Sequence, residues 1–240
     1  MTAPVFFATV GDTAAGDQIV LDGPEGHHAA DVRRLFAGEA IDLTDGAGVM
    51  LHGVVAEARR GELTVDVTER VVQPAPTPWF TVVQALAKGG RDEDAVEAMT
   101  EVGVDQVVGW TASRSIAKWT DRTEPKWTAT VQAAAKQSRR AWWPTVAGPA
   151  STADVAGRCE AASLAVVLHE AAAVPLASLS VPSHGEVVLV VGPEGGISDE
   201  ELAAFTAAGA AAVRLGQTVL RSSTAGVAAL SVLSAHSRWR

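Results

Sequence analysis

The chain of 240 residues contains a single cysteine, Cys159, and no apolar run long enough to cross a membrane. One cysteine cannot form an intramolecular disulfide or a cysteine metal cluster, so we expect a free, buried thiol and no metal site. A membrane helix needs about 18–20 consecutive apolar residues, and the densest apolar stretches, such as 187–191, are too short. Residues 1–10 also lack the basic and apolar regions of a signal peptide. These absences predict a cytoplasmic protein with no membrane segment.

Positive charge is also scarce, because 19 lysines and arginines stand against 28 aspartates and glutamates, giving a net charge of −9. Phosphate binding relies on lysine and arginine, so this balance argues at first against a nucleic-acid partner. The basic residues are unevenly spread, however, and residues 114–140 hold seven of them against two acidic residues. This basic segment is therefore either an RNA-facing patch or a solvated helix face. Its basic residues are Arg114, Lys118, Arg122, Lys126, Lys136, Arg139 and Arg140.

A proline-rich segment, residues 73–78, separates two regions that differ in their pattern of apolar and turn residues. Its three prolines at alternate positions exclude a helix and favour an extended, semi-rigid linker. In residues 1–72, short apolar runs alternate with glycine-containing turns, which predicts a small antiparallel β-barrel. Its expected strands are 40–44, 49–56 and 63–67, and its one expected helix is 27–35.

Residues 79–240 alternate apolar strands with helices, a pattern that predicts an α/β domain built on a parallel sheet covered on both faces. The last expected helix is small and apolar on nearly every side, so it must be buried, either inside the domain or between subunits. The expected strands are 79–87, 107–111, 164–169, 186–191 and 212–215. The expected helices are 92–102, 124–141, 198–208 and 223–235.

The sharpest local signal is the glycine loop Gly192-Pro-Glu-Gly-Gly196, which joins the strand at 186–191 to a helix. Ser198 and Glu201 form the pattern of a capping box at the start of that helix. Ligands of open α/β sheets bind beside such loops, where glycines let the backbone approach a ligand closely. The loop lacks the residues of a Walker A or GxGxxG motif, which disfavours a phosphate site. Taken alone, it is more often a tight turn than a binding loop.

A second glycine-containing loop, residues 215–221, again joins a strand to a helix. Two such loops at adjacent strand ends would form the walls of one pocket. A third strand end, residues 168–170, carries polar residues, although His169 is more simply explained as a loop residue than as a catalyst. His27 and His28 lack metal-ligand spacing, and we expect them to cap the short helix instead.

These motifs, taken in order, resemble one family. The first motif is Gly-Pro-Glu-Gly-Gly at 192–196, before a glutamate-rich helix, and the second is Leu-Gly-x-x-x-Leu-Arg-x-x-Thr-Ala at 215–225. Together they resemble the cofactor half of the RsmE methyltransferases. This family methylates N3 of a uridine in 16S ribosomal RNA. The resemblance covers nearly the whole chain and reaches the family's PUA-like N-terminal barrel. Further matching segments are His28 with 32–34, Gly38, 45–46, Lys88 and Arg91, 101–104, 113–115, and 137–140 with Pro144.

The resemblance implies a SPOUT-type parallel sheet with a C-terminal trefoil knot, assembled as a homodimer through the knot region. It implies S-adenosylmethionine as cofactor, no metal, and small-subunit ribosomal RNA or the assembled small subunit as partner. The residues that it places at the cofactor are Leu168, His169, Glu170, Gly192, Pro193, Glu194, Gly195, Gly196, Leu215, Gly216, Leu220, Arg221, Thr224 and Ala225. The residues that it places at the RNA are Arg34, Lys88, Arg91, Arg114, Gln137, Arg139 and Arg140.

Two positions depart from the family pattern. Val5 stands before the Phe6-Phe7 pair where the family usually has arginine, which puts part of the RNA contact in doubt. Ser223 stands where the family tends to have glutamate, so we place no general base there and leave the base unidentified. Arg221 is the candidate catalytic residue, because its charge beside the cofactor loop would favour the uridine anion.

The implied reaction is in-line transfer of a sulfonium methyl group to N3 of a uridine. That nitrogen lies on the Watson–Crick edge, so the base must be unpaired or flipped. Three other functions stay open: 2′-O-methylation of a tRNA or rRNA ribose, RNA binding or ribosome assembly without catalysis, and methylation of a small molecule. Tight S-adenosylmethionine binding would argue against the second, and salt-sensitive RNA binding would argue against the third.

Overall fold

The structure, a computed structural model, describes residues 2–240 and divides the chain into two compact units. The first unit comprises the described residues up to Ala75 together with Ala135–Trp143. The second unit comprises Pro76–Ala134 and Pro144–Arg240. Each unit has its own sheet and its own hydrophobic core.

The first unit is built on a mixed five-stranded sheet with the order β1-β3-β4-β5-β2. β1 runs parallel to β3, whereas the other neighbours are antiparallel, so the sheet is not wholly antiparallel as predicted. The chain from β1 to β3 passes through β2 and a helical segment, and such a long connection permits parallel pairing. The hydrophobic core of the first unit includes Ile41, Leu43 and Leu63. The strands are β1 (Val5–Phe7), β2 (Gln18–Leu21), β3 (Ala40–Thr44), β4 (Val49–Arg59) and β5 (Glu62–Val72).

The helical segment of this unit begins earlier than predicted, as α1 (Gly23–His27) followed by the π-helical turn η1 (His28–Val32). Pro24 lies in the first turn of α1, where its fixed φ suits a helix and its missing N–H breaks no bond. β4 and β5 also extend beyond the predicted strands, to 11 residues each. The additional residues of β4 are exposed, so they carry no apolar pattern that could predict them.

The first unit also includes residues 135–143, which follow most of a helix that belongs to the second unit. Lys136 Nζ lies 2.7 Å from Glu25 Oε1 in α1, and the two residues are 111 positions apart in the chain. The indole Nε1 of Trp142 donates a hydrogen bond of 3.0 Å to the carbonyl oxygen of Gln73. These long-range contacts, and not a local pattern, determine where the segment lies.

The second unit is an α/β domain on a seven-stranded parallel sheet with the order β10-β12-β9-β11-β6-β7-β8. The prediction of a parallel sheet is therefore confirmed. The strands are β6 (Trp79–Ala85), β7 (Gln106–Trp110), β8 (Thr145–Ala150), β9 (Leu164–Leu168), β10 (Val174–Pro175), β11 (Glu186–Val191) and β12 (Ala211–Arg214). The helices are α2 (Arg91–Glu101), α3 (Thr123–Gln137), α4 (Thr152–Ala161), the short 3₁₀ turn η2 (Leu176–Ser178), α5 (Asp199–Ala207) and α6 (Ser222–Ala235).

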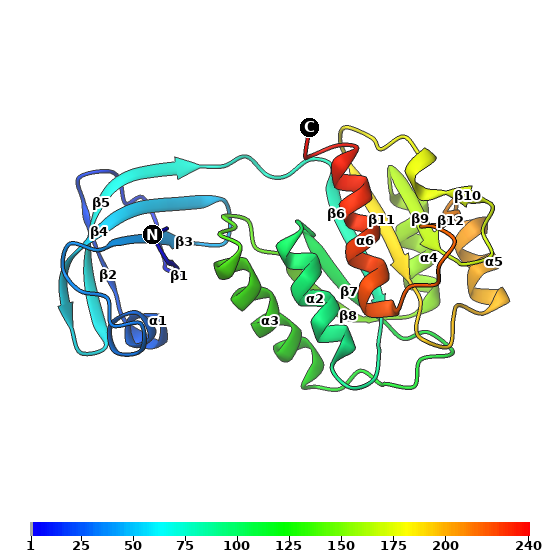
Figure 1. Ribbon diagram of the computed structural model, residues 1–240, viewed down its shortest axis with the longest axis horizontal. Helices are drawn as coiled ribbons and strands as arrows, with labels where there is room; N and C mark the ends of the chain where they lie inside the picture. The colour runs from blue at the N-terminus through cyan, green and yellow to red at the C-terminus, as the bar shows by residue number, and fades with distance from the viewer. Residues whose placement is uncertain (1) are drawn as a thin grey trace. The chain divides into compact units, whose positions relative to one another are not determined.

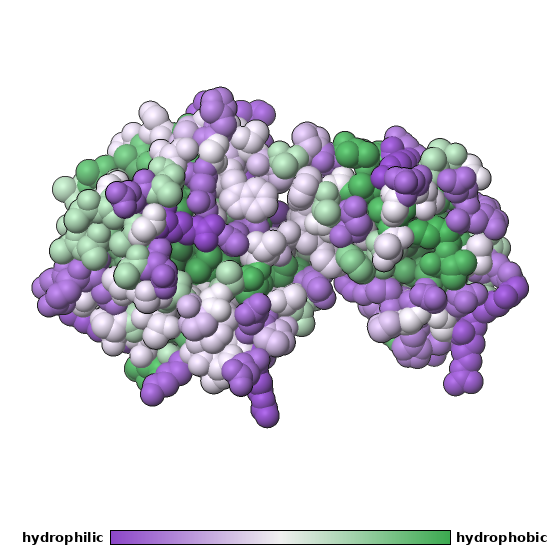
Figure 2. Space-filling view, turned by 180° about the vertical axis from the view of Figure 1, so that it is seen from behind, coloured by the Kyte–Doolittle hydropathy of each residue, from purple (hydrophilic) through white to green (hydrophobic). Residues whose placement is uncertain are grey.

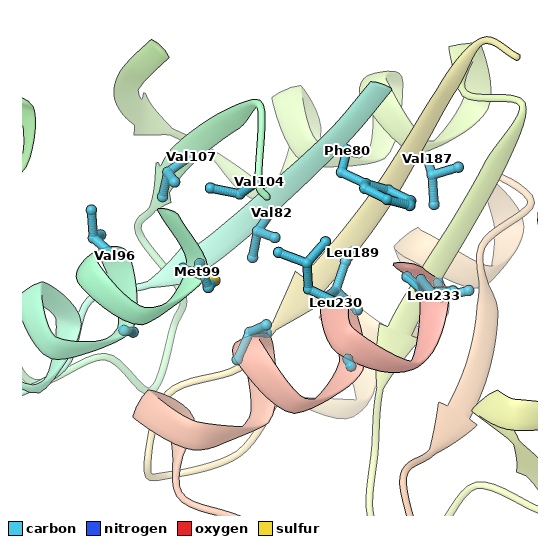
Figure 3. Close-up of a cluster of buried hydrophobic side chains, with 14 of the residues drawn as sticks. Phe80, Val82, Val96, Met99, Val104, Val107, Val187, Leu189, Leu230 and Leu233 are labelled. Atoms are coloured by element: carbon cyan, nitrogen blue, oxygen red, sulfur yellow. The ribbon is translucent and has the colours of Figure 1, made fainter. Parts of the chain in front are cut away.

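Helices cover both faces of this sheet (Figure 1). Successive side chains of a strand point to opposite faces, and β11 shows this alternation clearly. Val187 and Leu189 pack with α2 and α6, as the close-up of that core shows (Figure 3), whereas Val188 and Val190 pack with α4 and α5. Strands that are buried on both faces read as continuous apolar runs, which is why they could be recognised from the sequence.

Four elements of the second unit were not predicted, one of them the short turn η2. β8 is a half-exposed edge strand that contains glycine and proline, so it lacks an apolar run. α4 begins with a capping box formed by Ser151 and Asp154, a signal that could have revealed it. β10 has only two residues. In addition, α3 ends at Gln137 and not at 141, because Arg139 adopts a left-handed φ of +58°.

Two expectations about composition can be compared with the described residues. Cys159 is a free cysteine, as expected, and its burial raises the pKa of the thiol to about 11. Among residues 2–240, no helix combines the length and apolar character needed to span a membrane.

Candidate functional site

Three loops at the carboxyl ends of neighbouring strands line one cleft in the second unit. The loops follow β9, β11 and β12, and the cleft has a volume of about 850 Å³. The two glycine loops had been expected at adjacent strands, but β9 lies between β11 and β12. The loop after β9 completes the wall of the cleft. Small-molecule sites span roughly 300–1,000 Å³ and lie outside the carboxyl ends of strands in open α/β sheets. The cleft therefore has the size and position of a ligand site.

The glycine loop 192–196 forms the central wall of this cleft and leads into α5. Gly196 has a φ of +75°, a conformation that residues with side chains rarely adopt. The predicted capping box is confirmed: the Glu201 amide donates to Ser198 Oγ at 3.2 Å, and the Ser198 amide donates to Glu201 Oε2 at 2.9 Å. The start of α5 thus holds the end of the loop in place.

Glu201 also connects the glycine loop to a second segment. Its carboxylate is buried, with 4% of the residue exposed, and its Oε1 accepts a hydrogen bond of 2.6 Å from the amide of Ser113. The next residue, Arg114, directs its Nη1 toward the carbonyl oxygens of Gly195 and Ile197, at 3.3 and 3.4 Å. One buried carboxylate therefore positions the segment that carries Arg114 against the glycine loop.

Close packing at Gly195 supports the same arrangement. A Cβ atom on Gly195 would lie 3.1 Å from the Cβ and 3.2 Å from the carbonyl oxygen of Arg114. The absence of a side chain at this position thus makes room for Arg114. Gly195 also lines the cleft, so the glycine borders both Arg114 and the space expected for the ligand.

Glu194 anchors another segment at the edge of the cleft. Its Oε1 accepts a hydrogen bond of 3.3 Å from the Lys88 amide and lies 3.6 Å from Nη1 of Arg91. Lys88 lies in the connection from β6 to α2, whereas Arg91 is the first residue of α2 and lines the cleft. Arg91 and Arg114, both expected at the RNA, therefore lie in the wall of the cleft and not apart from the glycine loop.

The loop after β12 forms the outer wall and is largely exposed. Arg221 ends this loop as the N-cap residue of α6: its carbonyl oxygen accepts hydrogen bonds of 2.9 Å from the amides of Thr224 and Ala225, and the residue is exposed at the cleft. Ser222 follows and also lines the cleft; 7% of the residue is exposed, and its buried hydroxyl has no hydrogen-bond partner. Ser222 was missed because a lone serine has no distinctive sequence pattern.

The structure brings together all but one of the residues expected at the cofactor. Thr224 alone among them does not line the cleft. The cleft residues that the sequence did not single out include Val191, Ile197, Asp199, Val213, Arg214 and Ser222.

The residues expected at the RNA are divided between the two units. Lys88, Arg91 and Arg114 belong to the second unit, whereas Arg34, Gln137, Arg139 and Arg140 belong to the first. Within the basic segment, Lys126 pairs with Glu93 at 2.5 Å and Lys136 pairs with Glu25 at 2.7 Å. The positive charge of the segment is therefore partly neutralised within the protein.

Neither a metal centre nor a histidine cluster is found in residues 2–240: no group of three or more histidine, cysteine, aspartate or glutamate side chains lies close enough to hold a metal ion. His27 Nδ1 instead lies 2.7 Å from Asp31 Oδ2, one helical turn along the chain. His28 is the C-cap residue of α1, where its backbone N–H donates to the carbonyl oxygens of Pro24 and Glu25. His27 is the N-cap residue of η1, although its side chain accepts no capping hydrogen bond there.

Comparison with known proteins agrees with this geometry. The RNA methyltransferase domain family matches residues 73–234, and the RNA methyltransferase PUA domain family matches residues 21–68. These matches define the class, an RNA methyltransferase that carries a PUA domain. A ribosomal RNA small subunit methyltransferase E from Mycobacterium bovis is 45% identical over 249 residues, covering 100% of this chain and 94% of the relative. The chain belongs to the ribosomal RNA small subunit methyltransferase E family.

Two solved structures share the fold over nearly the full length. A methyltransferase E from Neisseria gonorrhoeae, bound to S-adenosylmethionine, has a TM-score of 0.88 at 23% identity and covers 98% of each chain. A Legionella pneumophila protein in complex with the same cofactor has a TM-score of 0.86 at 25% identity and covers 99% of each chain. The two-unit architecture is therefore shared with proteins that bind S-adenosylmethionine.

Proposed function

We propose that this protein transfers a methyl group from S-adenosylmethionine to N3 of a uridine in 16S ribosomal RNA. The observation that carries the proposal is the single cleft formed by three loops at the carboxyl ends of β9, β11 and β12, in a chain of the methyltransferase E family. Its relatives take their name from small-subunit ribosomal RNA, and the matched PUA domain supports an RNA substrate.

The residues of the cleft fit the cofactor. The nucleoside and methionine parts of S-adenosylmethionine offer apolar surface together with hydroxyl, carboxylate and ammonium groups. Leu168, Leu215 and Leu220 supply apolar contact, while the glycine loop supplies backbone donors and acceptors. Ser222 also lines the cleft, and its buried hydroxyl has no hydrogen-bond partner within the protein. The bound cofactor supplies an electrophilic methyl group on a sulfonium.

Arg221 is the residue that we propose to assist the chemistry. N3 of uridine carries a proton at neutral pH, so the acceptor gains negative charge as that proton leaves. The guanidinium of Arg221, exposed at the cleft beside the start of α6, would stabilise this charge. No carboxylate stands at Ser223, so proton removal is not assigned to that position.

The substrate RNA is expected to contact both units. We propose residues 1–72 as an RNA-binding PUA-like domain, 73–78 as the linker and 79–240 as the methyltransferase domain. Arg34, Gln137, Arg139 and Arg140 would bind RNA on the first unit, and Lys88 and Arg91 would bind it beside the cleft. Such a substrate places the protein in the cytoplasm.

We further propose that the second unit is knotted at its C-terminal part and pairs with a second copy through α6. On its inner face, α6 carries buried residues such as Leu230 and Leu233, whereas its residues Val227 and Val232 are half-exposed. A second copy would cover these apolar side chains. Light scattering should give twice the 24.8 kDa mass of one chain. A stable and active monomer would contradict the dimer.

The test of the function is deletion of the gene, followed by mass spectrometry of the nucleosides of 16S ribosomal RNA. We expect N3-methyluridine to disappear and to return when the gene is supplied again. Loss of a 2′-O-methylated nucleoside would instead support ribose methylation. An unchanged nucleoside profile, together with no binding of S-adenosylmethionine by the purified protein, would support a non-catalytic RNA-binding protein.

A further inference from the structure

An exposed aromatic ring on the first unit is held in a fixed position by its neighbours. Exposed apolar side chains occur on both units (Figure 2). Phe7, at the end of β1, is 41% exposed, and its ring centroid lies 5.2 Å from that of Trp143 at an interplanar angle of 44°. The other large exposed apolar residues of the unit are Val20, Val32, Phe36 and Val72.

Trp143 is itself anchored from two sides. Its amide donates a hydrogen bond of 2.9 Å to the Gly46 carbonyl, and its Nε1 donates one of 3.0 Å to the Arg140 carbonyl. Its indole ring packs on Gly46, where an added Cβ would lie only 3.0 Å from the ring. Because Trp143 cannot easily shift, it supports one side of Phe7 and leaves the rest of the phenyl ring exposed.

The electrostatic surroundings of this pair favour an anionic partner. Arg139 and Arg140 immediately precede the turn that carries Trp143, and Arg139 is exposed. The carboxylate of Asp45, next to Gly46, accepts hydrogen bonds from the amides of Ala47 and Val49. The carboxylate of Glu25 accepts a hydrogen bond of 3.3 Å at Oε2 from the Phe7 amide. Its charge is offset by Lys136, whose Nζ lies 2.7 Å from Glu25 Oε1.

A rigid aromatic ring beside arginines is the combination that binds unpaired nucleotides. Bases splayed out of single-stranded RNA stack on aromatic side chains, while arginines contact the phosphates. A phenyl ring on a strand, already held by a tryptophan, loses little conformational freedom when a base stacks on it. Phe36 is more exposed, at 64%, but among the described residues it packs against no second aromatic ring.

We propose that Phe7, supported by Trp143, is a stacking platform for an unpaired base of the substrate RNA, and that Arg139 and Arg140 of the same unit contact its phosphates. This inference rests on the proposed function, because it requires an RNA substrate. It assigns to the first unit a contact with a base in addition to contacts with the phosphate backbone. A single-stranded region near the target uridine is therefore part of what the enzyme recognises.

The test compares Phe7→Leu with Phe7→Tyr in filter binding to a single-stranded RNA oligonucleotide and to an RNA duplex of equal length. Leucine keeps an apolar side chain but removes the aromatic face, so we expect affinity for the single strand to fall about ten-fold. Tyrosine should restore it. The salt dependence of binding should not change, because no phosphate contact is lost. Duplex binding should also stay at the wild-type level.

Phe36→Leu is the matched control, since it makes the same substitution at an exposed phenylalanine of the same unit. Circular dichroism and thermal unfolding of each variant confirm that the first unit is folded. Normal single-strand binding by Phe7→Leu would overturn the platform, and so would equal losses of affinity in Phe7→Leu and Phe36→Leu. If the wild-type protein methylates RNA in that case, the proposed function still holds. A wild-type protein that neither binds RNA nor transfers a methyl group would overturn both.

Discussion

The two units differ in how their proposed ligand sites are made. In the cleft of the second unit, loops that contain glycine form much of the wall, and buried side chains such as Glu201 hold the glycine loop in place. On the first unit, the proposed RNA surface consists of side chains that project outward, among them Phe7, Arg139 and Arg140. A single substitution should therefore have a much larger effect in the cleft, where it moves a loop, than on the surface, where it removes one contact.

Gly196→Val should have the largest effect. Gly196 has a φ of +75°, and a β-branched residue at positive φ costs about 1–3 kcal/mol or forces the loop to move. We expect S-adenosylmethionine affinity, measured by calorimetry, to fall roughly a hundred-fold, a loss of about 2.7 kcal/mol. Gly209→Val is the control, because Gly209 has a φ of +89° but lies outside the cleft. Equal cofactor affinity in the two folded variants would exclude the glycine loop from the site.

Arg221→Ala should slow the reaction without weakening RNA binding. Removal of one preorganised charge at the reacting group lowers the rate by about 10²–10³-fold in well-studied enzymes, and an exposed arginine should give the lower part of that range. The measurement is single-turnover methylation with the enzyme saturated by cofactor and RNA. Arg221→Lys retains a positive charge and should recover part of the rate. If Arg221→Ala methylates at the wild-type rate, the arginine has no catalytic role.

Glu201→Gln should weaken cofactor binding by about ten-fold, although Glu201 does not line the cleft. The buried carboxylate accepts amides from both Ser113 and Ser198, and a buried hydrogen bond to a charged group contributes about 1.5–3 kcal/mol. Asp154→Asn makes the equivalent change in the capping box of α4, which lies outside the cleft. It should lower the thermal midpoint without changing cofactor affinity. An equal loss of cofactor affinity in both variants would indicate a general effect on the fold.

The contrast between the units also explains what could be predicted from the sequence. β11, the glycine loop and the capping box at Ser198 are local patterns, so their positions were predicted within two residues. The clustering of the three loops followed from the rule that parallel strands share one carboxyl edge. The position of β9 between β11 and β12 could not be predicted, because strand order depends on pairing between distant segments.

Long-range contacts account for the other differences. The assignment of residues 135–143 to the first unit depends on contacts such as Lys136 with Glu25 and Trp143 with Phe7. Arg114 contacts the carbonyl oxygens of Gly195 and Ile197, which lie 81 and 83 positions further along the chain. Its basic neighbours suggested an RNA contact, but charge along the chain does not indicate which unit or loop an arginine contacts.

The comparison of Arg114→Ala with Arg140→Ala tests the division between cleft and RNA surface most directly. Both arginines occur in the basic segment, but Arg114 contacts the glycine loop and Arg140 belongs to the first unit. We expect Arg114→Ala to lower S-adenosylmethionine affinity several-fold, because the loop loses its hydrogen bonds to the guanidinium. Arg140→Ala should leave cofactor affinity unchanged, weaken RNA binding and lower the salt slope by about one. Equal cofactor affinity in both variants, or normal RNA binding by Arg140→Ala, would contradict this division.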